Sequence, residues 1–303
     1  MESVIKTSDL TKVYGDNAAV NLLNLDIPKG EIYGFLGLNG AGKTTTMRML
    51  LGMIKPTKGD ASLFGEKVGT SNKSLWKNVG YMVESTYAYP NLTVMECLII
   101  FSKYYGLKNK QNVERVIDLL KLNAYRNVQS KHLSLGNLQR LGLAKALIHN
   151  PELLILDEPV NGLDPSGIVE IRNLLKELSS KGTTILISSH LLSEISKIAD
   201  TIGIIHKGNL IKELPADSLH QQLKRKLIIN TTDNAKTASL LAENDIMTQV
   251  NNNELEITNH QDLSSPEKVA RLIVDKQIGL TKLYPFEEEL ETYFLRTIKQ
   301  KTA

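Results

Sequence analysis

Residues 37–44 read GLNGAGKT, and this stretch decides the fold. It fits the pattern G-x-x-x-x-G-K-[S/T]. It lies between a strand-like run, EIYGFL at 31–36, and a helical run, TTTMRMLLGMI at 44–54. In that setting the backbone N–H groups of a glycine-rich turn wrap phosphate groups, and the helix N-terminus adds positive potential. The alternative is a glycine-rich turn with a chance Lys-Thr, which the strand before and the helix after disfavour.

We therefore predict a nucleotide site in which the Lys43 ammonium reaches the terminal phosphates and the Thr44 hydroxyl binds Mg²⁺. The expected cofactors are ATP and Mg²⁺. The residues predicted to hold the nucleotide are Gly37, Leu38, Asn39, Gly40, Ala41, Gly42, Lys43, Thr44 and Thr45.

The composition is that of an ordinary globular protein, with 303 residues, 42% of them apolar and 23% charged. A net charge of +3 gives little reason to expect a nucleic-acid partner, and none is predicted. The single cysteine, Cys97, excludes an internal disulfide, and no secretory signal precedes residue 10, so we expect a reducing cytosol. The longest apolar runs, such as LLIL at 153–156, are far shorter than the roughly 20 residues that cross a bilayer. Membrane contact is therefore expected only through a partner.

Four short, almost continuously apolar runs indicate a covered, mainly parallel sheet of the α/β class; they are residues 32–36, 153–156, 184–188 and 201–205. Helical periodicity replaces strands at about 85–150, which predicts a helical subdomain inserted into an ATP-binding domain of residues 1–215. Residues 216–303 follow the order strand, helix, strand, strand, helix, strand and closing helix. This order predicts a separate small α+β domain with ferredoxin-like order.

Two further strand ends carry chemistry. LLILDEP at 153–159 ends in Asp157 and Glu158, and TTILISSH at 183–190 ends in His190. Ligands of such sheets bind at the carboxyl ends of the strands. Asp157 is expected to hold Mg²⁺ through water, and Glu158 to orient and deprotonate the attacking water. His190 is expected to bind the γ-phosphate or steer that water.

Structural roles are the alternative for each of these groups. An Asp-Glu pair after a strand is also typical of a helix N-cap, but the phosphate-binding loop upstream favours catalysis. A lone histidine is usually structural or exposed. That interpretation is kept for the other five, which are His132, His149, His206, His220 and His260.

Four features together resemble the ATP-binding cassette (ABC) ATPases: the phosphate-binding loop (P-loop), LLILDEP followed by NGLD at 161–164, His190, and HLSLGNLQRLGLAKAL at 132–147. The resemblance covers residues 4–215 and implies a P-loop NTPase fold of the ABC type. It implies that Ser134 and Gly136 of the signature motif act in trans, on the nucleotide of a second subunit. It also implies that Tyr14 stacks on adenine and that the loop reached through Asp164 communicates between two nucleotide sites. The signature departs from the usual Leu-Ser-Gly-Gly-Gln, because Leu135 replaces the first glycine.

Glu84 ends the strand-like run VGYMVE at a position where the ABC family normally has a glutamine that touches Mg²⁺ and water. No glutamine occurs between Thr44 and Lys110, so either Glu84 fills this place or the place is empty. A carboxylate suits a hard cation and repels an unshielded phosphate, so it should depend on Mg²⁺ more than an amide does. The alternative is a solvated glutamate at the start of a loop. Glutamate here, together with SLG in the signature, resembles the ATPases of lantibiotic immunity and bacitracin-type peptide exporters.

Other P-loop classes fit less well. A small GTPase needs Asn-Lys-x-Asp, and NKSL at 72–75 lacks the Asp. The expected function is therefore ATP hydrolysis in an ABC exporter of antimicrobial peptides, at the cytoplasmic face of the membrane. The expected assembly is a homodimer of cassettes beneath separate permease subunits. Export of other drugs, or an ABC ATPase without a transport role, are the alternatives.

Overall fold

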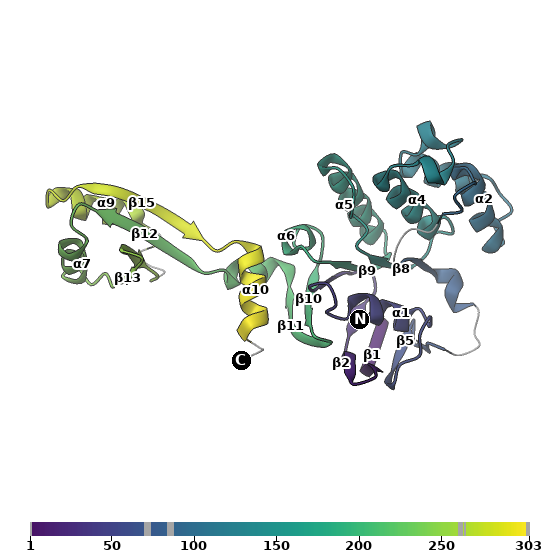
Figure 1. The fold of residues 1–303 in the computed structure, drawn as a ribbon, viewed down its shortest axis with the longest axis horizontal. Coiled ribbons are helices and arrows are strands. Elements are labelled where there is room, and N and C mark those ends of the chain that lie inside the picture. The colour runs from purple at the N-terminus through teal and green to yellow at the C-terminus, as the bar shows by residue number, and fades with distance from the viewer. Residues whose placement is uncertain (1, 70–73, 84–87, 260–262, 264, 301–303) are drawn as a thin grey trace. The chain divides into compact units, whose positions relative to one another are not determined.

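The computed structural model describes residues 2–69, 74–83, 88–259, 263 and 265–300. Two compact units divide the chain, Met1–Ser218 and Leu219–Ala303 (Figure 1). The boundary expected from the sequence lay at residue 215, and its status as a domain boundary stays a prediction.

The first unit is built on a six-stranded sheet in the order β11-β10-β4-β9-β8-β7. Neighbouring strands from β10 to β7 are parallel, and β11 pairs with β10 antiparallel at the edge. Every residue of β4, β8 and β9 is buried, as expected for a sheet covered on both faces. The four predicted strand runs are confirmed. The bounds are β4 Ile32–Leu36, β7 Val79–Met82, β8 Leu153–Asp157, β9 Thr184–Ser189, β10 Thr201–His206 and β11 Asn209–Pro215.

A second, antiparallel sheet precedes and flanks the first; sequence periodicity did not predict it. Its strands are β1 Ser3–Tyr14, β2 Asn17–Leu23, β3 Asp26–Pro28, β5 Lys58–Leu63 and β6 Glu66–Lys67. Ile5 and Leu63 from this sheet share one buried core with Phe35 of β4 and Met47 of α1, which spans Lys43–Leu50. This core fixes the start of α1 against both sheets.

Helices fill the described part of the predicted insertion, residues 88–150, and no strand occurs among them. Thr93 and Glu96 form a reciprocal capping box at the start of α2, which satisfies two backbone N–H groups. Ser134 caps α4 and Asp164 caps α5, so both predicted site residues begin a helix. The helices of the insertion are α2 Val94–Tyr104, α3 Gln111–Leu119, η2 Asn123–Tyr125, η3 Ser130–His132 and α4 Leu135–Leu147. The helices before and after it, up to β12, are η1 Leu75–Asn78, α5 Pro165–Ser180, α6 Leu192–Ile195 and η4 Ala216–Gln222.

The second unit has a four-stranded sheet in the order β13-β14-β12-β15, with every neighbouring pair antiparallel. This is the strand order of a split βαβ unit, as the element sequence predicted. One face of the sheet packs on α7 and α9 through a core that includes Leu227, Ile229, Leu241 and Ile273. The bounds are β12 Arg225–Thr231, α7 Asn234–Ala242, β13 Gln249–Asn251, β14 Glu254–Ile257, α9 Pro266–Asp275, β15 Leu280–Glu287 and α10 Leu290–Gln300.

A buried ion pair joins the end of β15 to α10. The Glu288 carboxylate is buried; it accepts hydrogen bonds from Arg296 Nε at 2.8 Å and Arg296 Nη2 at 2.7 Å, and from the Lys224 backbone N–H at 3.1 Å. Hydrogen bonds from Arg296 hold the pKa of Glu288 below its ordinary value of 4.5. A depressed carboxyl pKa means that the charged form stabilises the folded unit above pH 4.5, and that this contribution disappears as pH falls through the folded pKa.

Replacing Glu288 by Gln should therefore reduce the stability of residues 219–303 at neutral pH. This loss of stability should become smaller as pH falls below 4.5. Hydrogen exchange of β12 and β15 amides, compared between variant and wild type at each pH, measures this difference. Glu287→Gln is the matched control, because the Glu287 side chain is about half exposed and its partners Arg225 and His220 are 3.4 and 3.5 Å away. A Glu288→Gln effect of equal size at pH 7 and pH 3.5 would contradict the assignment.

Candidate functional site

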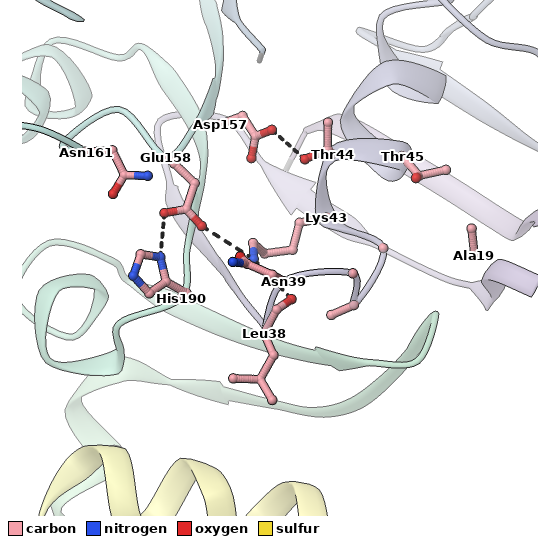
Figure 2. Close-up of a pocket in the computed structure, with 13 residues that line it drawn as sticks. Ala19, Leu38, Asn39, Lys43, Thr44, Thr45, Asp157, Glu158, Asn161 and His190 are labelled. Atoms are coloured by element: carbon pink, nitrogen blue, oxygen red, sulfur yellow. Dashed lines mark hydrogen bonds and ion pairs between the residues drawn. The ribbon is translucent and has the colours of Figure 1, made fainter. Parts of the chain in front are cut away.

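A cavity of about 330 Å³ opens at the carboxyl ends of β4, β8 and β9 (Figure 2). It contains most of the residues that the sequence predicted to bind or hydrolyse a nucleotide. The lining residues are Ala19, Leu38, Asn39, Gly40, Ala41, Gly42, Lys43, Thr44, Thr45, Asp157, Glu158, Asn161 and His190.

The loop after β4 has the tight geometry that its glycines permit. The Ala41 N–H donates to the Leu38 carbonyl at 3.0 Å, which closes a turn. Gly42 has φ +113°, and a Cβ placed there would lie 2.4 Å from the Ala19 carbonyl oxygen. Only glycine fits, because β2 passes directly over this position.

Lys43 starts α1 and points back into the loop. Its side chain is 6% exposed, and Nζ donates to the Gly37 carbonyl at 2.6 Å. The same ammonium lies 3.4 Å from Glu158 Oε1. A buried ammonium with a neutral and an anionic partner is correctly placed to exchange either of them for a phosphate oxygen.

Asp157 and Thr44 form the second part of the site. The Thr44 hydroxyl donates to Asp157 Oδ2 at 2.6 Å, and Ser188 of β9 donates to the other carboxylate oxygen. Asp157 is 8% exposed. A hydroxyl and a carboxylate are the oxygen donors that Mg²⁺ prefers, so these residues fit the cation.

Glu158 occupies the centre of the cavity wall. Figure 2 shows its carboxylate between Lys43 and His190, and His190 Nδ1 lies 2.7 Å from Oε2. The Glu158 backbone has φ +50°, a left-handed conformation that costs a residue with a side chain about 1 kcal/mol or more. Strained backbone of this kind is concentrated at functional sites because the surrounding structure must hold it.

The remaining predicted residues lie outside this cavity, as far as the structure describes its lining. Tyr14 is 49% exposed, and Lys12 Nζ lies 5.0 Å from the centre of its ring. Ser134 accepts from the Asn137 N–H at 3.3 Å as the cap of α4, which Gly136 continues. Roles for these residues toward adenine or a partner's nucleotide stay predictions. Glu84 is outside the described residues.

Asp164 also acts locally as a helix cap. It accepts from the Ser166 hydroxyl at 2.7 Å and from the Gly167 N–H at 3.0 Å. These hydrogen bonds, with that of Ser166 the largest, lower the pKa of Asp164. The carboxylate therefore fixes where α5 begins.

Sequence patterns missed several residues that shape the site. Ala19 lines the cavity from the antiparallel sheet, Asn161 lies in the quoted NGLD segment, and Ser188 donates to Asp157. Gln139 of α4 donates to the Glu158 carbonyl at 2.8 Å. No local signal marks Ala19 or Gln139, since their contacts come from distant elements.

A second cavity of about 520 Å³ is lined mainly by aromatic and apolar side chains, including Trp76, Tyr81, Tyr104 and Tyr105. It lies at the border between the α/β core and the helical segment. Its lining includes the C-terminal side of α1 and Tyr81 of β7, the strand that leads toward Glu84. Tyr105 stacks on His149, with ring centroids 3.8 Å apart. Burial lowers the pKa of His149 to about 4, so this ring is neutral at physiological pH.

No helix in the described ranges combines the length and the apolar character that crossing a bilayer requires.

Comparison with known proteins places this geometry in a family. The ABC transporter family profile matches residues 20–161. The bacitracin transport ATP-binding protein BcrA of Bacillus licheniformis is 43% identical over 300 residues, 98% of each chain. The lantibiotic transport ATP-binding protein SrtF of Streptococcus pyogenes is 39% identical over 217 residues, covering 71% of this chain and 92% of the relative.

The fold agrees with these relatives. A dimeric structure of MJ0796, a bacterial ABC transporter cassette, superposes with a TM-score of 0.65 at 25% identity, over 70% of this chain and 98% of that one. The chain belongs to the ATP-binding proteins of the ABC transporters. It is an ATPase of the P-loop class with the α/β fold expected from residues 37–44.

Gly42→Ala should weaken ATP binding about tenfold or more, which corresponds to ~1.4 kcal/mol, because the added Cβ collides with the Ala19 carbonyl. Titration with a fluorescent ATP analogue measures the affinity. Gly182→Ala is the matched control, since Gly182 has a similar φ of +97° with open space around the added Cβ. Equal affinities for both variants would show that the close approach of β2 does not shape the loop.

Proposed function

We propose that this protein powers the export of antimicrobial peptides, as the ATP-hydrolysing subunit of an ABC exporter. The observation that carries the proposal is the likeness to a bacitracin transport ATP-binding protein along 98% of both chains, the second unit included. The lantibiotic transport relative supports the same cargo class for the first unit. Two copies would act as a homodimer beneath separate permease subunits, at the cytoplasmic face of the membrane.

The contacts in the cavity support the chemistry that we assign to it. The triphosphate of ATP enters the loop 37–45, and the Lys43 ammonium exchanges its contacts with Gly37 and Glu158 for phosphate oxygens. Glu158, released from Lys43, orients and deprotonates the attacking water. His190, hydrogen-bonded to Glu158, keeps that carboxylate in place and is assigned to bind the γ-phosphate or steer the water.

Mg²⁺ would be held by Thr44 directly and by Asp157 through water. Among the described residues no group of three or more His, Cys, Asp or Glu side chains could hold a metal ion. We expect oxygen atoms of the nucleotide to complete the ligands of the cation, as is usual for Mg²⁺ in ATP sites. When bound, it neutralises phosphate charge during hydrolysis. We assign Glu84 to the same cation, in the place of the glutamine usual in the family.

The predicted site residues that lie outside the cavity are assigned roles that require a closed dimer or a bound nucleotide. Ser134 and Gly136, at the N-terminus of α4, would cap the γ-phosphate held by the partner's loop, because a helix N-terminus attracts anions. Tyr14, half exposed, would stack on adenine. Asp164 would position the loop that links the two sites. The dimeric structure of the similar cassette supports pairing.

The aromatic cavity is assigned to the permease. Its described lining comes from the end of α1, from η1, from β7 and from the C-terminal end of α2. Its lining joins the α/β core to the helical segment. A permease helix bound in this cavity would be displaced when the helical segment moves relative to the α/β core.

Glu158→Gln should bind ATP with nearly unchanged affinity and lose turnover by roughly 10²-fold or more, because the amide cannot accept the proton. Phosphate release and equilibrium binding measure the two quantities. Glu194→Gln is the matched control: its side chain is 22% exposed against 20% for Glu158, and it pairs with Lys197 outside the ATP cavity. Normal turnover in Glu158→Gln would remove the residue from the base role.

The cargo is tested with the same variants in cells. A sensitive strain that expresses the chain with its permease subunits should gain resistance to bacitracin or to a lantibiotic. The Glu158→Gln chain should give no resistance, and the Glu194→Gln chain should give full resistance. Resistance to unrelated drugs alone would favour a general drug exporter.

Glu84→Gln should retain hydrolysis and show an altered Mg²⁺ dependence, because an amide binds the cation less strongly and repels the γ-phosphate less than a carboxylate does. Titrating Mg²⁺ at fixed ATP measures the shift, and Glu243→Gln in the second unit serves as the control. If Glu84→Ala changes neither the Mg²⁺ dependence nor peptide resistance, Glu84 is an ordinary solvated residue.

A further inference from the structure

We propose that Gln139 is a positioning residue for ATP hydrolysis, which transmits the position of helix α4 to Glu158. The proposal rests on the role of Glu158 as general base and goes beyond it by naming what holds that residue. Its starting point is the left-handed backbone of Glu158, with φ +50°. Such a conformation persists only where neighbouring groups hold it.

Three hydrogen bonds hold the Glu158 peptide groups. The Glu158 N–H donates to Ser188 Oγ at 3.0 Å. The Glu158 carbonyl accepts from the Asn161 N–H at 3.2 Å and from Gln139 Nε2 at 2.8 Å. Asn161 belongs to the same turn, and Ser188 lies on β9 of the same sheet. Gln139 is thus the member of this set that comes from the helical segment.

The Gln139 amide is built into the structure. Gln139 is 8% exposed, so its side chain has little freedom to leave the Glu158 carbonyl. A buried amide that loses its acceptor remains desolvated without compensation, which keeps this contact formed. The contact therefore moves with α4.

A second contact joins the same helix to the same loop. A Cβ built on Gly162 would lie 2.4 Å from Leu135 Cδ2, so the Leu135 side chain occupies the space over Gly162. Leu135 and Gln139 are four residues apart, about 6 Å along one helix. Helix α4 thus touches the segment 158–162 at two points, one turn apart.

The consequence is a mechanical link between two nucleotide sites. Ser134, at the N-terminus of α4, is assigned to the ATP of the partner, and Gln139 of the same helix holds Glu158 beside this chain's own ATP. A displacement of α4 on dimer closure would change the direction of the Glu158 carboxylate through its backbone. Glu158 would reach its productive position only when the partner's nucleotide fixes α4.

Gln139→Leu removes the donor and keeps an apolar group of similar size in the buried space. We expect kcat to fall about tenfold or more with the KM for ATP within twofold, because ground-state binding does not involve Gln139. The Hill coefficient of hydrolysis should fall toward one. Gln129→Leu is the matched control, because Gln129 Nε2 also donates to a backbone carbonyl, that of Asn91 at 3.1 Å, and neither residue lines the cavity.

Two measurements separate positioning from mere packing. The double variant Gln139→Leu with Glu158→Gln should be no slower than Glu158→Gln alone, since both act through one carboxylate. The ratio of Gln139→Glu activity to wild-type activity should rise as pH falls, because a protonated carboxyl at position 139 can again donate a hydrogen bond to the Glu158 carbonyl.

Unchanged kcat in Gln139→Leu, or additive losses in the double variant, would overturn the proposal. A variant that loses ATP binding and thermal stability together would show a structural role only and overturn it as well. Normal turnover in Glu158→Gln would instead contradict the general-base role of Glu158. Failure of that role is therefore distinguishable from failure of the positioning role of Gln139.

Discussion

The buried ammonium of Lys43 is the charge on which the site depends. It lies 2.6 Å from the Gly37 carbonyl and 3.4 Å from the Glu158 carboxylate, and it is almost fully removed from solvent. An ammonium buried without partners would be strongly unfavourable, so the contacts of Lys43 with these two groups keep the loop and Glu158 in one arrangement in the absence of nucleotide. Phosphate oxygens compete for the same cation. Under the proposed mechanism, binding of ATP and release of Glu158 are a single exchange of partners.

This exchange requires a loop that keeps its shape, and packing supplies it. Gly42 passes beneath the Ala19 carbonyl of β2 with no room for a side chain. Met47, Met49 and Leu50 of α1 are buried in the core shared by the two sheets. The antiparallel sheet thus has a direct role in the site, because it sets where α1 begins. Residues 37–44 alone would not fix the direction of their N–H groups.

What the sequence predicts here depends on how local the cause is. The strands β4, β8, β9 and β10 were predictable because continuous apolar runs record burial on both faces. Asp157, Glu158 and His190 followed from their place at the ends of such strands. The antiparallel sheet was not predictable in the same way, because β1 has an irregular burial pattern and register shifts in its pairings with β2, β3 and β5.

Gln139 illustrates the harder case, because it lies in the quoted stretch 132–147 but nothing in the sequence shows that it contacts Glu158. Its importance depends on the left-handed backbone of Glu158, which no apolar pattern records. The same limit applies to Ser134 and Gly136, whose assigned partner lies in a second copy.

The departure at Leu135 gains a physical meaning from its surroundings. The usual glycine would leave the space over Gly162 open, whereas the leucine side chain fills it and puts the signature segment in contact with the loop after Glu158. Gly162 has φ +77° and no side chain, so it accepts this approach without a clash. Leu135 thus adds a contact between α4 and the segment 158–162, in addition to the hydrogen bond from Gln139 to the Glu158 carbonyl. Under the proposed coupling, closure of a cassette pair would act on Glu158 through two contacts of one helix, and the leucine in the signature motif supplies one of them.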